Sequence, residues 1–456
     1  MKYTLSALAL LATTSLAGAV DLPSGKAQPQ APANYVKVCD AYGRGFFYIP
    51  GTDSCLKVGG MLRQDVAFVP AGDSYKVTAG ARAIDKAAAG LNTVGWETRA
   101  RIELDARTPT DVGTVQTAMG IRFGRRSGAL ADVAQPTSAT QSGTDTTPVI
   151  EYAFIRFAGI TAGAARDNFS FMPSAIYAAQ HWSSFIINPK QLAYTAVLGG
   201  GLSATVAIQD ATDTAIAPVD AVNASATYYA PQNEKNINLV GNLRWDQPWG
   251  QVQIMGAGRQ ASVQDSTGGT YSQEKAVWAA GAGLKVNMPF TGHKSNALWL
   301  TGAYADGMTE YTTAYTSNKM ANWRREVNGW VMNHPSVVAY STGLETVTSW
   351  NAAALYQHWL TDKYRVNAFG SYGQVTAPES AKALVWDGKK GFGDATVWSV
   401  GSNFAWIPTQ NFELGVEGIY SNVKQDVRYT LASSTNLVKS ESDGNWTMRL
   451  RAERRF

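Results

Sequence analysis

Long polar loops and very short turns alternate along this chain, and the stretches between them are long enough to be strands. The seven short turns are 108–110, 158–159, 199–201, 247–249, 289–293, 361–362 and 408–410. The eight long loops are 70–92, 126–147, 168–191, 212–235, 263–273, 308–345, 376–392 and 428–443. A transmembrane β-barrel places its short turns in the periplasm and its long loops outside, whereas a soluble sandwich has no reason to separate them. The pattern predicts an all-β, sixteen-stranded antiparallel transmembrane β-barrel whose last strand ends at Phe456.

Side-chain alternation indicates strands that have one face in lipid and the other in water. From Ala276 to Met288 every second residue is apolar, and the residues between them are mostly Lys, Asn or Gly. Between Val94 and Arg107 one face is mainly apolar, and the other carries Glu97, Arg99, Arg101, Glu103, Asp105 and Arg107. The final segment repeats this pattern, with Arg449, Arg451, Glu453 and Arg455 on one face. So many charges on one face require a water-filled interior, because burying unpaired charges is too costly.

The N-terminus has the pattern of a secretory signal peptide. Lys2 precedes an apolar core over 5–16, and 17–19 read Ala-Gly-Ala, which is typical of a cleavage site. The core is too short for a membrane-spanning helix. We therefore expect a signal peptide at 1–19, a periplasmic lead-in at 20–54 and the transmembrane barrel at 55–456. The formal net charge of +4 is too small to indicate binding to nucleic acid.

The chain has two cysteines, Cys39 and Cys55. In an exported chain the expected state of such a pair is a disulfide. A metal site needs more ligands than two cysteines, and a redox site favours closer spacing. We expect a structural disulfide that pins the lead-in to the base of the barrel.

Five stretches resemble the alphaproteobacterial porins of the rhizobial and Brucella type. They are 35–43, 47–52 and 55–60 around the two cysteines, 151–159, and the C-terminal strand 449–456. The resemblance implies a sixteen-stranded homotrimeric porin of the outer membrane, in contact with lipid, for passive diffusion of small hydrophilic solutes and ions. It also implies a third loop folded into the lumen, and an assembly signal at Phe456. Loop 308–345 departs from the family as a candidate insertion.

The third long loop and one wall of the barrel are the expected pore constriction. Residues 168–191 are rich in aromatic side chains and contain no Glu, and Asp167 lies at their edge. Counting along strands that are neighbours in a closed barrel places several arginines at a similar depth, partly offset by acids that include Asp65. The expected constriction residues are Arg63, Arg99, Arg101, Arg122, Arg449, Arg451, Glu97, Glu103, Asp167 and His181. This predicts a neutral to mildly anion-preferring pore, and the alternative is a row of neutralised arginines without effect on transport.

Catalysis is the competing class of function. His181 lies near Ser183 and Ser184 in sequence, but sequence neighbours do not make a catalytic triad. Glu413 and Glu417 are four residues apart on one strand, about 13 Å, which is too far for a carboxylate pair, so we expect solvated lumen charges. No metal or cofactor motif is evident. The sequence therefore favours a diffusion channel over a barrel enzyme or adhesin, with a solute-specific porin as the alternative within the channel class.

Overall fold

The structure is a computed structural model of the chain. The residues that it describes are 37–68, 73–77, 84–88, 94–128, 130, 142–143, 148–177, 188–211, 219–220, 237–264, 272–312, 337–340, 343–379, 382, 394–430 and 436–456. The expected signal peptide at 1–19 and most of the lead-in lie outside these residues, so the predicted domain boundaries stay a prediction. Among the described residues, no helix has the length and apolar character that crossing a membrane requires.

Strands make up most of the described residues, and three short 3₁₀ helices lie between them. In chain order the elements are η1 (Asp40–Tyr42), β1 (Phe46–Tyr48), β2 (Cys55–Phe68), β3 (Asp73–Val77), β4 (Ile84–Ala88), β5 (Val94–Thr110), β6 (Gly113–Gly128), β7 (Ser142–Gly143), β8 (Val149–Phe157), β9 (Ile160–Ala164), β10 (Lys190–Gly199), β11 (Leu202–Asp210), β12 (Val219–Asp220), β13 (Ile237–Gln247), β14 (Gly250–Gln264), β15 (Ser272–Asn287), η3 (Pro289–Thr291), β16 (Ala297–Asp306), η4 (Thr309–Tyr311), β17 (Val337–Tyr340), β18 (Gly343–Thr346), β19 (Thr348–Thr361), β20 (Tyr364–Thr376), β21 (Ala395–Thr409), β22 (Phe412–Thr430) and β23 (Asn436–Arg455).

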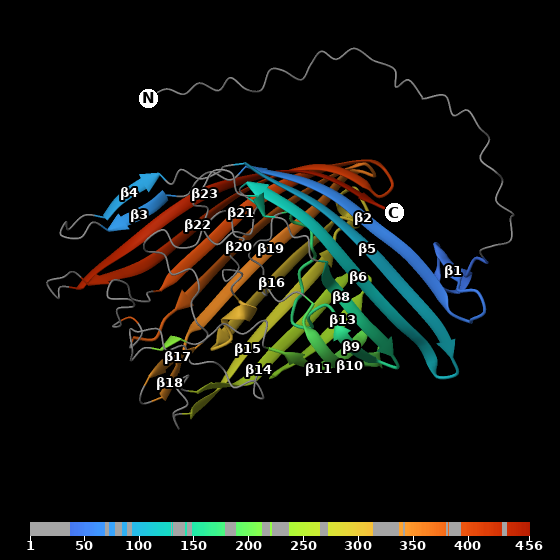
Figure 1. Cartoon of the computed structure of the whole chain (residues 1–456), viewed down its shortest axis with the longest axis horizontal. Helices are drawn as coiled ribbons and strands as arrows, with labels where there is room; N and C mark the ends of the chain where they lie inside the picture. The colour runs from blue at the N-terminus through green and yellow to red at the C-terminus, as the bar shows by residue number, and fades with distance from the viewer. Residues whose placement is uncertain are drawn as a thin grey trace, which may run out of the picture.

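Sixteen of these strands form a closed antiparallel barrel, which confirms the predicted fold (Figure 1). They are β2, β5, β6, β8–β11, β13–β16 and β19–β23. The barrel closes where β2 pairs with β23, from Met61 opposite Arg455 to Phe68 opposite Met448. The backbone of Phe456 continues this pairing through two hydrogen bonds with Gly60, of 3.0 and 3.1 Å. Closure leaves no open strand edge, which a lipid environment requires.

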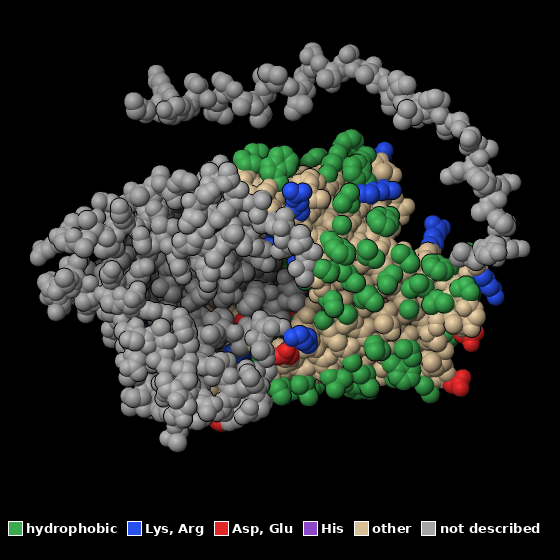
Figure 2. Space-filling model, viewed as in Figure 1, with side chains coloured by type: hydrophobic (Ala, Val, Ile, Leu, Met, Phe, Trp, Pro, Cys, Tyr) green, Lys and Arg blue, Asp and Glu red, His purple; other side chains and the backbone are tan. Residues whose placement is uncertain are grey.

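The outer wall of the barrel is apolar, as the alternation predicted. In the segment around Trp278 the side chain of Trp278 is 46 % exposed, whereas its neighbours Val277 and Ala279 are each 2 % exposed and face inward. Figure 2 shows one face of this wall, where hydrophobic side chains gather over the strands. Outward aromatic rings also contact one another across neighbouring strands, as in an aromatic girdle. The contacting pairs are Trp278–Tyr304, Trp350–Tyr372, Trp398–Tyr420 and Tyr420–Trp446.

Two of the predicted short turns are wrong by two residues. The prediction placed a turn at 108–110, but β5 continues to Thr110 and turns at 111–112. Pro109 is tolerated there because the pairing between β2 and β5 ends at Arg107, so this part of β5 has a neighbour on one side only. The prediction of a turn at 408–410 is wrong in the same way, because β21 reaches Thr409 after a register shift.

The predicted long loop 428–443 is mostly strand. β22 runs to Thr430 and β23 starts at Asn436, and these two residues pair with each other. A strand that crosses a membrane needs only about 9–11 residues, so both strands extend well beyond the bilayer. A strand that lies beyond the bilayer has no lipid face, so its sequence need not show the apolar alternation that identifies a membrane strand. The predicted loops 70–92 and 308–345 similarly contain the β3–β4 hairpin and strand β17.

The lead-in is joined to the barrel at the end that carries the short turns. Cys39 and Cys55 form a disulfide, as predicted, and Cys55 is the first residue of β2. Strand β1 pairs with β2, with Phe46 opposite Lys57. The Arg107 guanidinium lies 5.0 Å from the centre of the Phe46 ring, which packs the lead-in against β5. Figure 1 shows β1 at the opposite end of the barrel from the β3–β4 hairpin.

Candidate pore constriction

The chain leaves the barrel wall after β9 and enters the interior, where residues 165–177 (the third loop segment) are described. Its first turn is tied to the wall by Asp167, which is 3 % exposed. One carboxylate oxygen of Asp167 accepts a hydrogen bond of 3.0 Å from the Gln209 amide on β11. The other oxygen accepts from the backbone N–H and the hydroxyl of Ser170, both at 3.0 Å. Burial raises the pKa of the Asp167 carboxyl, and these donors oppose that shift.

The middle of the third loop segment packs on the apolar wall, our name for the inward-facing residues Val240, Met255, Ala257, Val277, Ala279, Ala303 and Ala305 of β13–β16. Phe169 is fully buried and its ring lies 4.6 Å from that of Tyr311, which follows β16 and is also fully buried. Phe171 lies directly over Gly283 of β15, where a Cβ atom would sit 2.3 Å from the ring. Glycine is therefore required at 283 for the loop to approach this closely. Burying each of these large side chains contributes about 1.5–3 kcal/mol.

The far end of the described segment is held by the opposite side of the barrel. The carbonyl of Ala175 accepts a 2.9 Å hydrogen bond from Asn403 on β21. The Tyr177 backbone N–H donates to Glu417 at 2.7 Å, and its hydroxyl donates to Glu413. Both acids lie on β22, and Glu417 is only 1 % exposed. The expectation that Glu417 is a solvated lumen charge is therefore wrong, because it serves as an anchor for the loop.

Arginines of β23 complete this anchor. The carbonyl of Tyr177 accepts hydrogen bonds from Arg449 at 2.9 Å and from Arg451 at 3.1 Å. The Arg451 guanidinium also lies 4.3 Å from the centre of the Tyr177 ring. Both guanidiniums bind the carboxylate of Asp65 on β2, at 3.4 and 2.7 Å. The inward fold of the third loop, predicted from resemblance, is thus present in the described residues. The segment starts at the end of β9, and its far end is bound by side chains of β21, β22 and β23.

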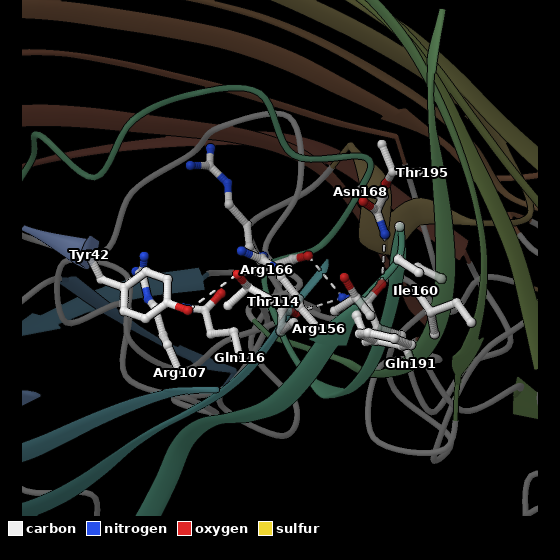
Figure 3. Close-up of a pocket in the computed structure, with 16 residues that line it drawn as sticks. Tyr42, Arg107, Thr114, Gln116, Arg156, Ile160, Arg166, Asn168, Gln191 and Thr195 are labelled. Carbon is white, nitrogen blue, oxygen red and sulfur yellow. Dashed lines mark hydrogen bonds between the residues drawn. The ribbon is translucent and has the colours of Figure 1, made fainter. Parts of the chain in front are cut away.

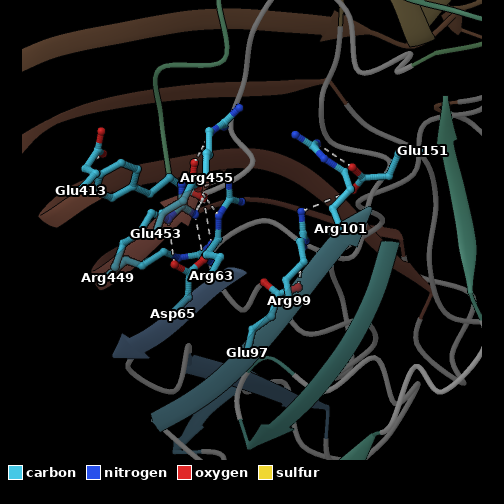
Figure 4. Close-up of polar contacts among 12 residues, drawn as sticks. Arg63, Asp65, Glu97, Arg99, Arg101, Glu151, Glu413, Arg449, Glu453 and Arg455 are labelled. Atoms are coloured by element: carbon cyan, nitrogen blue, oxygen red, sulfur yellow. Dashed lines mark hydrogen bonds and ion pairs between the residues drawn. The ribbon is translucent and has the colours of Figure 1, made fainter. Parts of the chain in front are cut away.

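Most of the predicted constriction residues lie together on the charged wall, which faces inward from β2, β5, β6, β8 and β23 (Figure 4). We define the charged wall as Arg63, Asp65, Glu97, Arg99, Arg101, Glu103, Arg122, Arg126, Glu151, Arg449, Arg451 and Glu453. Strand pairing aligns them in depth, since Arg63 is opposite Arg99 and Asp65 is opposite both Glu97 and Arg451. Eight of the ten residues predicted for the constriction are members: Arg63, Arg99, Arg101, Arg122, Arg449, Arg451, Glu97 and Glu103.

Every arginine of the charged wall has a carboxylate within 4.0 Å. The contacts are Arg63–Glu453 at 2.5 Å, Arg99–Glu97 at 2.8 Å, Arg101–Glu151 at 2.8 Å, Arg122–Glu151 at 3.6 Å and Arg126–Glu97 at 2.9 Å, together with the Arg449 and Arg451 pairs to Asp65. Arg101 also contacts Glu103. The side chains of Arg99, Arg101 and Arg122 are 18–19 % exposed, so they remain in contact with the open lumen.

Two predicted residues are not part of this cluster. Asp167 lies at the base of the loop and bonds to β11, far along the wall from Arg99 in strand order. His181 lies outside the described residues. Sequence reasoning also missed Glu151, the carboxylate that three arginines share. A register shift between Gly120 and Ile121 lies opposite it, and simple alternation along the strand does not follow such a shift.

Among the described residues, no cluster of three or more His, Cys, Asp or Glu side chains is arranged to hold a metal ion. The inward cluster is instead an array of guanidinium–carboxylate pairs beside a loop that partly fills the barrel. Such an array can order water and retard or attract ions that pass it.

Comparison with known proteins agrees with this architecture. Residues 26–448 match the family model described as Porin subfamily. The porin Omp2b of Brucella suis biovar 1 and that of Brucella melitensis biotype 1 are each 29 % identical over 289 residues, which is 62 % of this chain and 67 % of theirs. In fold the chain is similar to the crystal structure of the outer membrane channel DcaP of Acinetobacter baumannii, with a TM-score of 0.52 and 13 % identity over 88 % of this chain and 97 % of that one. The chain therefore belongs to the Porin subfamily and is an outer-membrane porin channel.

Proposed function

We propose that small hydrophilic solutes and ions diffuse passively through an aperture between the third loop segment and the charged wall. The observation that carries this proposal is the asymmetric anchoring of the loop. Its aromatic residues are buried against the apolar wall and its far end is bound at β22 and β23. The side chains of Arg99, Arg101 and Arg122 on β5 and β6 remain partly exposed.

We propose that the constriction is close to neutral in fixed charge, with a mild preference for anions. The ion pairs of the charged wall support the first part, because each guanidinium is offset by a nearby carboxylate. Three arginines share Glu151, which supports a small positive excess. A narrow passage bounded by protein strengthens the field of such an excess.

The family favours a channel over an enzyme. We propose that the protein has no enzymatic activity and that its long loops do not carry an adhesin function. Purified protein in planar bilayers tests this directly. Large stepwise conductance supports the channel, and a protein that stays closed in bilayers contradicts it. Liposome swelling with sugars of graded size then separates a general porin, whose rates fall smoothly with size, from a solute-specific one.

We also propose a homotrimer, an assembly signal at Phe456 and no interaction with nucleic acid. The trimer rests on the resemblance to Brucella-type porins. The backbone of Phe456 is paired with Gly60 where the barrel closes and its ring is 74 % exposed, which supports a role for this residue in assembly. Chemical cross-linking in native outer membranes tests the trimer, and a monomer pattern contradicts it. Deleting Phe456 should abolish heat-resistant barrels in the outer membrane.

A further inference from the structure

A second inward feature lies at the periplasmic end of the lumen, away from the constriction. A cavity of about 560 Å³ opens beside the β8–β9 turn at 158–159 (Figure 3). The pairing of β6 with β8 ends with Gln116 opposite Arg156, whereas the β5–β6 hairpin continues to Thr110 and Gly113. The β5–β6 hairpin therefore extends further into the periplasm than the β8–β9 hairpin, and the cavity lies beside this step. Its volume is within the range of small-molecule sites.

The charge of this cavity differs from that of the charged wall. Three arginines line it, Arg107, Arg156 and Arg166, and no Asp or Glu does. Arg107 is bound to Asp105 behind the lining, at 2.9 and 3.2 Å. Among the described residues, no carboxylate comes within 4.0 Å of Arg156 or Arg166. Asp105 and Asp167 act on Arg156 and Arg166 only from a longer distance, so the cavity holds two guanidiniums without a direct carboxylate partner among the described residues.

The guanidiniums of Arg156 and Arg166 are held in place by neutral groups. Arg166 donates hydrogen bonds to the carbonyls of Phe171 and Met172, at 3.4 and 2.9 Å. Arg156 lies over the Phe154 ring, 4.5 Å from its centre, and is exposed to the lumen. A guanidinium that is fixed on an aromatic face keeps its N–H groups available for a ligand.

One side of the cavity is formed in part by Tyr42 of the lead-in. The Tyr42 hydroxyl is 3.4 Å from the Thr114 hydroxyl, and its ring lies 5.6 Å from the Arg107 guanidinium. The Cys39–Cys55 disulfide fixes this segment at the barrel rim. In Figure 3 Tyr42 and Arg107 lie on one side of the cavity and Asn168 and Gln191 on the other. Hydroxyl and amide groups thus surround the cationic centre, which is the lining that a polar anion needs.

We propose that this cavity is a transient binding site for small organic anions that carry a carboxylate or phosphate group, with Arg156 as the principal ligand. The proposal rests on the proposed function, because an anion reaches the cavity through the pore. Guanidinium pairs with either oxyanion in a bidentate geometry, so the shared chemistry is a compact oxyanion. The site draws anions past the nearly neutral constriction and retains them briefly at the periplasmic exit.

The test is block of ion current through single channels in planar bilayers. Succinate and inorganic phosphate are the probes, and glucose is the neutral comparator. Each is titrated into the compartment on the periplasmic side, and the concentration for half-maximal current reduction is measured. Removing a charge-assisted hydrogen bond should raise that concentration by about tenfold or more in Arg156→Gln, and Arg156→Lys should recover part of the loss.

Arg455→Gln is the matched control. Arg455 lies on β23 at the same end of the barrel, is paired with Glu453 at 2.7 Å, is 53 % exposed and does not line the cavity. We expect it to change the half-blocking concentration by less than about twofold, because its charge is screened by solvent. An equal rise of the half-blocking concentration in both variants would contradict a local site. An unchanged half-blocking concentration of succinate in Arg156→Gln would contradict it as well. So would block by glucose at the same concentration as by succinate. Absence of any conductance in the parent protein instead contradicts the channel function itself.

Discussion

The apolar wall and the charged wall are built from equivalent strands of one barrel, yet their inner faces meet different surroundings. On the apolar wall the inward positions of β13–β16 are mainly Ala, Val and Met, and they are covered by Phe169, Phe171 and Tyr311. On the charged wall the inward positions of β2 and β5 carry both arginines and carboxylates, and β6 adds Arg122 and Arg126. The first wall is covered by protein. The second binds the third loop segment through Arg449 and Arg451, and its Arg99, Arg101 and Arg122 side chains remain partly exposed to the lumen.

This difference shows how a sixteen-stranded barrel becomes a narrow pore. A loop that enters the lumen needs a dry surface for its aromatic side chains and partners for its backbone. The apolar wall supplies the surface, and Asn403, Glu417, Arg449 and Arg451 supply partners at the far end. The proposed passage therefore lies beside the charged wall, whose arginines and carboxylates would set the ion preference.

The largest expected effect is on the stability of the charged wall. Asp65→Asn removes the carboxylate that binds Arg449 and Arg451, and Asp65 is fully buried. Leaving buried guanidiniums without their counter-charge should cost about 3–5 kcal/mol. Thermal unfolding in detergent measures it. Asp246→Asn, at an exposed pair with Arg244, is the control and should cost about 1 kcal/mol or less. A similar loss of thermal stability in both variants would show that burial does not make the Asp65 ion pairs more important than an exposed pair.

The next effect concerns the apolar wall. Gly283→Val places a side chain where the Phe171 ring lies, so the loop must move or the barrel must strain, at about 1–3 kcal/mol. We expect lower thermal stability together with a larger and noisier unit conductance, because the loop can no longer pack against the apolar wall. Gly256→Val is the control, since a Cβ at 256 has its nearest atom at 3.8 Å. Unchanged conductance in Gly283→Val would mean that the loop does not define the aperture.

A smaller effect is expected where the loop meets β22. Tyr177→Phe keeps the ring over Arg451 but removes the hydroxyl that donates to Glu413. Glu413 retains Arg365 at 2.8 Å, so the loss should be about 1 kcal/mol or less. More frequent brief closures in single-channel records, with the same open conductance, are the expected result. A large fall in stability would indicate that this hydroxyl holds the whole loop.

The smallest energetic effect is on ion preference. Replacing Arg99 and Arg101 together by Ser leaves Glu97, Glu103 and Glu151 with fewer counter-charges. Cation preference should increase and conductance should rise slightly, with a change of about threefold in the permeability ratio, or about 0.6 kcal/mol. Glu151→Gln should shift the preference in the opposite direction. Reversal potentials in a salt gradient measure both, and unchanged values in the double variant would place the constriction elsewhere.

The sequence predicted the strand number, the closing strand pair and most of the charged wall, because lipid and water impose a strict alternation of side chains. Arg63, Arg99 and Arg449 could be placed by counting along strands. The apolar wall was not predicted, because a single apolar residue such as Val277 on the inner face of a strand does not by itself indicate a dry surface. Its role is visible only when Phe169 and Phe171 are folded over it.

The partners within the charged wall were harder to predict. Glu151 lies opposite a register shift, and Glu417 was taken as solvated because an alternation pattern cannot show that a loop covers it. The ends of the longest strands were missed for another physical reason. Beyond the bilayer a strand has no lipid face, so its sequence resembles a loop.

The central claim is that the passage follows the charged wall and that the loop seals the apolar wall. The two native cysteines are both in the disulfide, so a single introduced thiol can be modified selectively. Arg101→Cys and Met255→Cys channels would be exposed to the anionic reagent 2-sulfonatoethyl methanethiosulfonate while current is recorded. Arg101 lines the lumen at 18 % side-chain exposure, whereas Met255 is 2 % exposed beneath the loop. We predict a stepwise, irreversible current decrease in Arg101→Cys and no change in Met255→Cys, and equal modification of both would contradict the account.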